Sequence, residues 1–275
     1  MRAIVLILLC VCASAMGCVT RAAEPLASCA TKFGLTSTEY WPASVDNAMG
    51  LANEIASAGS TLRLRKTCTV GDAACVSLEL VDSHLLSRAD TVFVPDGERC
   101  VVLTDALLTT MKAWFERDEQ RGGFAVEPGA AVALILLHEL GHVDRGPAPR
   151  PDDVAQILVE RPVGELQADL YAARLLQKAQ SSGAGSFTSA TSVILAAGHI
   201  SWNLLANRLI DHFGATTLRT PQVFADRGTT HLNLEMRFLV IQYALQPSEA
   251  ARQLLQEFVD ARRQVSMPHS LLGSR

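Results

Sequence analysis

At the centre of the chain stands His138-Glu139-Leu140-Gly141-His142, directly after an apolar run from Ala130 to Leu137. Four residues along an α-helix advance by about 400° and about 6 Å, so His138 and His142 lie on one face, one turn apart. Two imidazoles at that separation can bind one zinc ion at about 2.0–2.1 Å each. Glu139 projects beside them, within reach of a water on the open position of the metal, which completes the HExxH pattern. The alternative is a pair of solvent-facing histidines on an ordinary helix.

Two histidines leave zinc one protein ligand short, because catalytic zinc sites use three. The segment Glu165-Leu166-Gln167-Ala168-Asp169 begins 23 residues after His142 and offers Glu165 as the candidate. Asp169 lies one helical turn further on the same face, where it can accept the second N–H of a ligand imidazole. Acidic pairs of this kind are also common on helix surfaces. Together with the HExxH pattern, however, Glu165 and Asp169 predict a site for one Zn²⁺. His138, His142 and Glu165 would hold the ion, and Asp169 would orient a histidine.

Length and composition indicate a globular protein of one or two domains. The 275 residues are 49% apolar and 19% charged, which excludes a disordered chain. The 24 basic and 28 acidic residues are dispersed, and the longest basic run is the short cluster at residues 63–66. This pattern does not support nucleic-acid binding, and it gives no indication of an oligomeric state.

Hydrophobic periodicity, helix caps and turn residues predict an α+β fold, mostly helical with a small antiparallel sheet. The expected strands are 61–67, 76–81, 91–94 and 100–103, with a turn at 95–98. The first expected helices are 45–58, capped by Ser44, and a helix from Thr104 or Asp105 to about 119. The HExxH helix is expected from Pro128 to before Gly146, and the next helix from Val163 to a linker at 181–186. Three further helices are expected at 188–210, 232–245 and 248–265.

The N-terminus predicts an export signal over residues 1–17. Arg2 precedes an apolar stretch, residues 3–11, that is too short for a convincing membrane span. Cleavage is expected either after Ala15 or between Gly17 and Cys18, and the second resembles a bacterial lipoprotein site at which Cys18 takes a lipid. Residues 18–40 are then a tether and lead-in to one domain, 41–275. These features predict export to a bacterial periplasm, with a membrane tether through Cys18 as one alternative.

Four cysteines remain beyond the signal and Cys18, an even number that suits disulfides in an oxidising compartment. Four cysteines allow three pairings. Cys68 and Cys75 bracket a turn-like stretch, which favours a Cys68–Cys75 bridge and, with it, Cys29–Cys100. None of the four lies near the HExxH segment or in C-x-x-C spacing, so a cysteine zinc site is not expected.

Residues 165–169 resemble the ExxAD motif of gluzincin metallopeptidases, specifically the HtpX and CAAX-prenyl-endopeptidase family and its periplasmic members. Residues 92–108 resemble the strand and helix entry of that family, A-F-x-x-P-G-G-x-I-x-V-x-x-G-L-L. Residues 230–237 resemble its T-H-P-x-x-x-x-R segment. The chain departs from the family at Asp96 and Asp105, where the family has Gly, and at Leu232, where it has Pro. These departures spare the ligands and the base and fall on the substrate-side loops.

The resemblance implies a zincin-like metallopeptidase domain in which Glu139 is the general base. It implies that His231 aids the developing oxyanion and that Arg237 helps to position that region. The alternative for His231 is an ordinary histidine of a surface loop. The resemblance also implies that an extended protein or peptide substrate pairs with an edge strand along Val92 to Val94.

We therefore expect a zinc-dependent endopeptidase of the bacterial cell envelope that hydrolyses peptide bonds in misfolded or misassembled proteins. The alternative is a zinc-bearing, chaperone-like or latent binding module with little proteolysis. Glu139 favours the enzyme, since such a module has no need of a general base. A purely structural zinc is less favoured, because structural sites usually use four Cys or His ligands.

Overall fold

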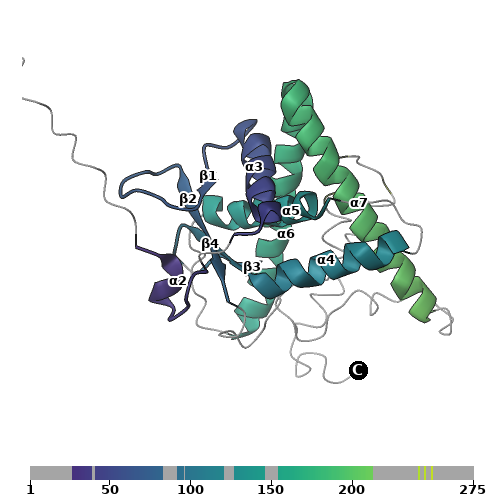
Figure 1. The fold of residues 1–275 in the computed structure, drawn as a ribbon, viewed down its shortest axis with the longest axis horizontal. Helices are drawn as coiled ribbons and strands as arrows, with labels where there is room; N and C mark the ends of the chain where they lie inside the picture. Colours follow the sequence, from purple (N-terminus) through teal and green to yellow (C-terminus); the bar gives the residue numbers. More distant parts are fainter. Residues whose placement is uncertain are drawn as a thin grey trace, which may run out of the picture.

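The computed structural model describes residues 27–38, 41–82, 92–95, 97–120, 127–145 and 154–212, together with residues 241, 245 and 249. A four-stranded sheet lies between the short helix α2 (Cys29–Lys32) and a layer of longer helices (Figure 1). The combination of a helical layer with a small sheet agrees with the expected α+β class.

The sheet has the strand order β1 (Arg63–Arg65), β2 (Cys75–Val81), β4 (Cys100–Thr104), β3 (Val92–Phe93). β3 and β4 pair antiparallel, as predicted, with Val92 opposite Leu103. The expectation of a wholly antiparallel sheet is wrong, because β1 is parallel to β2 and β2 is parallel to β4. Parallel strands are normally covered on both faces, and every residue of β2 and β4 is buried.

The polar residues of β2 are the reason for this error. Ser77 and Glu79 alternate with apolar residues, as they would in a strand with one face in water. In the structure, residues 28–37 cover that face, so Ser77 and Glu79 are only 7% and 6% exposed. The apolar residues of β2 that alternate with them face the main core on the helical side of the sheet: Val76, Leu78 and Leu80.

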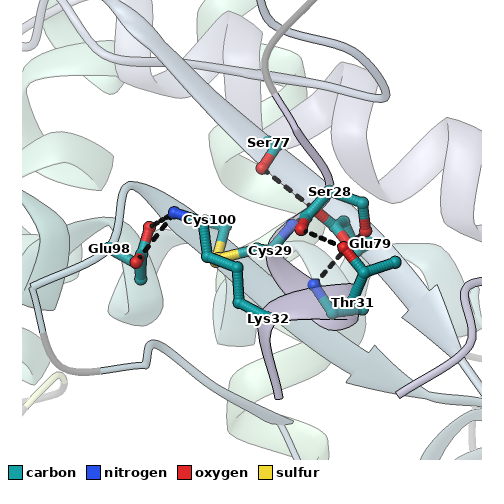
Figure 2. Close-up of polar contacts among 9 residues, drawn as sticks. Ser28, Cys29, Thr31, Lys32, Ser77, Glu79, Glu98 and Cys100 are labelled. Carbon is teal, nitrogen blue, oxygen red and sulfur yellow. Dashed lines mark hydrogen bonds and ion pairs between the residues drawn. A yellow bond between two sulfur atoms is a disulfide. The ribbon is translucent and has the colours of Figure 1, made fainter. Parts of the chain in front are cut away.

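Glu79 binds the N-terminal segment to the sheet (Figure 2). Its carboxylate accepts hydrogen bonds from the backbone N–H groups of Cys29 and Ala30, at 2.6 and 2.9 Å, and from Ser28 Oγ at 2.6 Å. Burial by itself raises the pKa of Glu79, but the hydrogen bonds outweigh it and hold the pKa below its ordinary value. The Cys29–Cys100 disulfide ties the same segment to β4. Residues 28–37 of the predicted lead-in are therefore packed on the sheet.

The predicted Cys68–Cys75 disulfide is also present, so both favoured bridges are confirmed. It joins Cys68, in the connection between the parallel strands β1 and β2, to Cys75, the first residue of β2. That connection comprises only residues 66–74, fewer than the dozen or more that a parallel crossover usually takes. A short connection between the two strands suffices because β1 has only three residues.

The two edges of the sheet differ. On one edge, Asn53 of α3 (Ala43–Ser57) donates from Nδ2 to the carbonyl oxygen of Leu64 at 2.9 Å and accepts from the Leu64 N–H at 2.8 Å. A side-chain amide thus pairs with β1 as a neighbouring strand would. On the other edge, no strand of the described residues pairs with the outer side of β3. Unpaired edges of this kind are where a further extended chain adds to a sheet.

Helix α5 (Pro128–Arg145) runs through the centre of the helical layer. It packs against α3, α6 (Val154–Ser182) and α7 (Ala184–His212), and it also contacts β4 and α4 (Asp105–Gln120). Residues 129–143 of α5 are buried except Ile135 and His142, which are partly exposed. The HExxH segment is therefore part of the core. Within the described part of the chain, no helix combines the length and apolar character needed to cross a membrane.

Several predicted helix boundaries hold, and others need correction. α5 begins at Pro128, and Thr104 Oγ1 accepts the Leu107 N–H at 3.3 Å at the start of α4. Ser44 does not cap α3, because Pro42 is the N-cap residue and Ser44 lies inside the helix.

The predicted start of α6 at Val163 is wrong, since the helix begins at Val154 and contains Pro162. The predicted start lies directly after this proline, which is accommodated inside the helix although proline removes one helix hydrogen bond. The linker expected at 181–186 is reduced to Gly183, whose φ of 143° suits glycine. The helices predicted at 232–245 and 248–265 lie outside the described residues, apart from helical positions 241, 245 and 249.

Candidate metal centre

Two helices, α5 and α6, carry every side chain of the candidate centre. On α5, His138 and Glu139 are 2% and 5% exposed, and the His142 side chain is 22% exposed. On α6, the side chain of Glu165 is 12% exposed. The centre therefore has a buried floor and is more open at His142.

Gly141 determines how closely the two helices approach each other. A Cβ atom at Gly141 would lie 2.9 Å from Ala168 Cα and 3.2 Å from both the Ala168 carbonyl oxygen and Tyr171 Cβ. Only a residue without a side chain allows the backbones this close. The contact is one residue before His142 on α5 and three residues after Glu165 on α6, so it brings the histidine and the carboxylate together.

Three of the predicted residues converge at one point. The Nε2 atoms of His138 and His142 are 3.0 Å apart. Glu165 places Oε2 at 3.2 Å from His138 Nε2 and Oε1 at 3.3 Å from His142 Nε2. With one ligand atom taken from each of the three residues, these atoms all lie within 4.8 Å of one another. The predicted association of Glu165 with the two histidines is therefore present.

Asp169 takes the position expected of a residue that orients a ligand. Its Oδ1 atom is 2.6 Å from Nδ1 of His138, and Asp169 is 1% exposed. An ionised carboxylate at this distance requires a proton on Nδ1, because the carboxylate only accepts hydrogen bonds. Nε2 of His138 then carries a lone pair that faces His142 and Glu165.

These residues fit a metal ion. Lone pairs on two imidazole nitrogens and a carboxylate converge, an arrangement that a cation stabilises. Zinc bonds of about 2.0–2.1 Å in tetrahedral geometry separate neighbouring ligand atoms by about 3.3 Å, close to the 3.0–3.3 Å found here. His138, His142 and Glu165 could therefore hold a metal ion.

Other predicted residues lie outside the described part of the chain. These are His231, Arg237, Cys18 and the predicted signal, residues 1–17. Val92 to Val94 is described, and its first two residues form the edge strand β3.

Sequence interpretation missed the residues that set the helix crossing. Gly141 and Gly164 each leave room for an atom of the opposite helix, namely the Ala168 backbone and the Arg145 guanidinium. The available signal was the glycine itself, because a glycine inside a helical pattern often has a packing reason. What it packs against depends on residues far away in the sequence.

Comparison with models of protein families, with curated proteins and with solved structures finds no match for this chain. The resemblance of its motifs to the gluzincin family therefore stays a prediction. The case for a function rests on the geometry of the centre.

Proposed function

We propose that this protein is a zinc-dependent endopeptidase. The observation that carries the proposal is the convergence of His138, His142 and Glu165, with the buried Glu139 next to His138 in helix α5. Two histidines and one glutamate are one of the ligand sets of catalytic zinc, which keeps a fourth position open. Structural zinc is instead usually closed by four Cys or His ligands.

The chain's own residues have separate roles in this proposal. Bound zinc would act as a Lewis acid and lower the pKa of a water toward about 7. Glu139 accepts a proton from the water that attacks the peptide carbonyl, and it donates a proton to the leaving amine. Asp169 holds the proton on Nδ1 of His138, so that the lone pair on Nε2 is the one that would bind the metal.

The two sheet edges support an extended polypeptide as the substrate. Asn53 occupies the β1 edge, whereas no described strand pairs with the outer side of β3. Main-chain hydrogen bonds to an edge strand bind extended peptides with little dependence on sequence. Such binding suits unfolded or misassembled proteins, and the predicted export signal assigns the activity to the bacterial cell envelope.

The test compares the unsubstituted protein with Glu139→Gln on casein, an unfolded protein, with the zinc content of each measured. Glu116→Gln, at an exposed position on α4, is the matched control. We expect cleavage by the unsubstituted protein and the control, and none by Glu139→Gln at equal zinc content. If no variant cleaves although zinc is bound, the latent binding module is favoured over the endopeptidase.

A further inference from the structure

A second contact between α5 and α6 lies one turn beyond the metal centre. Contacts between the helices pair residue 141 with 168 and residue 145 with 164, so the two helices run antiparallel. His142 and Glu165 lie between these two contacts. The Gly141 contact fixes the helices on one side, and Arg145 is the residue that joins them on the other.

Arg145 makes three interactions with the turn of α6 that carries Glu165. Its guanidinium lies over Gly164, where a Cβ atom would be 3.1 Å from Nη2. Its Nη1 atom donates a hydrogen bond to Oε1 of Gln167. Partial burial lowers the pKa of the guanidinium, and the nearby Glu165 carboxylate opposes that shift. Glu165 therefore lies, in the sequence, between the two residues that Arg145 contacts, Gly164 and Gln167.

We propose that Arg145 is a positioning residue, which holds the Glu165 turn against α5 through Gly164 and Gln167 and so preorganises the third metal ligand. This inference rests on the metal centre of the proposed function. Groups that orient a metal ligand without binding the metal typically change metal affinity by about 10–100-fold. Gly164 is part of the arrangement, because a side chain there would meet the guanidinium.

The charge of Arg145 and its positioning of Glu165 predict opposite changes in metal affinity when Arg145 is removed. A guanidinium near a divalent cation repels it, so if charge alone mattered, removing Arg145 would tighten metal binding. If Arg145 positions Glu165, removing it weakens binding. Removing the acceptor on Gln167 leaves the charge of Arg145 unchanged, so it weakens binding only if position matters.

The experiment uses the full chain and three variants, Arg145→Met, Gln167→Leu and the control Arg174→Met. Arg174 is also on α6, exposed and nine residues beyond Glu165. Zn²⁺ affinity is measured by competition with a chromophoric chelator, and Co²⁺ is added separately as a probe whose visible spectrum reports ligand geometry. Thermal unfolding of each metal-free variant checks that it is folded.

We expect Arg145→Met and Gln167→Leu each to weaken Zn²⁺ binding about tenfold and to change the Co²⁺ spectrum, with Arg174→Met unchanged. Unchanged or tighter binding in both variants would overturn the positioning role and leave the proposed endopeptidase standing. A lower melting temperature of the metal-free variants with the same Co²⁺ spectrum and affinity would also overturn it, because that is a structural clamp. Absence of Zn²⁺ binding by the unsubstituted protein would overturn both proposals.

Discussion

Substitution of Gly141 by alanine tests whether the helix crossing assembles the metal centre. The new Cβ would lie 2.9 Å from Ala168 Cα, whereas ordinary contacts begin at 3.4 Å, so the helices must separate by 3.4 − 2.9 = 0.5 Å or more. Overpacking of this kind costs about 1–3 kcal/mol. Alanine regains about 1 kcal/mol of helix propensity over glycine. The net loss of folding free energy is therefore about 0–2 kcal/mol.

Metal binding should suffer more than stability. Ligand distances in metal sites tolerate about 0.2 Å of error, less than the displacement that Gly141→Ala imposes between α5 and α6. We expect Zn²⁺ affinity to fall at least about tenfold, a loss like that from removing an orienting partner. The assay combines urea unfolding of the metal-free protein with Zn²⁺ titration against a chelator.

Gly50→Ala is the matched control for this experiment. Gly50 lies on the exposed side of α3, and a Cβ atom there would meet nothing within 4 Å. This substitution should stabilise the protein by up to about 1 kcal/mol and leave Zn²⁺ affinity unchanged. If Gly141→Ala also stabilised the protein and bound Zn²⁺ as tightly as the unsubstituted chain, the role given to the crossing would be refuted.

Three further predictions concern the metal centre and the N-terminal segment. Asp169→Asn should weaken Zn²⁺ binding about 10–100-fold, measured by chelator competition, since it removes the charge that orients His138; unchanged affinity would contradict that role. The pKa of Glu79 is lower in the folded protein, so its contribution to stability is present above about pH 4.5 and is lost as the pH falls through the folded value. Urea unfolding at a series of pH values should therefore show that Glu79→Gln loses less stability on acidification than the unsubstituted protein. An equal loss in both proteins would contradict this contribution of Glu79. Replacing Cys29 and Cys100 together by serine opens a loop with a sequence separation of 71 and should cost about 4 kcal/mol in chain entropy, which the urea midpoint reports; a loss below 1 kcal/mol would show that Glu79 suffices to hold the segment.

Local periodicity made the centre predictable. His138, His142, Glu165 and Asp169 lie at helical spacings, and the geometry of one helical turn places each pair on one face. The disulfides were predictable for a similar reason, because a short loop favoured one bridge and left one pairing for the rest.

Long-range contacts were not predictable from the same pattern. The role of Glu79 depends on a segment about 50 residues earlier in the chain that covers it, and a polar strand residue gives no sign of such cover. The start of α6 shows a local rule overridden by context, since Pro162 lies within the helix. Gly141 was visible as a glycine, but its partner Ala168 comes from another helix.

The most direct test of the account is a crystal structure of the full chain grown with Zn²⁺, with anomalous diffraction recorded at the zinc edge. We predict one anomalous peak at about 2.0–2.2 Å from Nε2 of His138, Nε2 of His142 and a carboxylate oxygen of Glu165. A peak bound by other residues, or none at these three side chains at saturating Zn²⁺, would contradict the central claim.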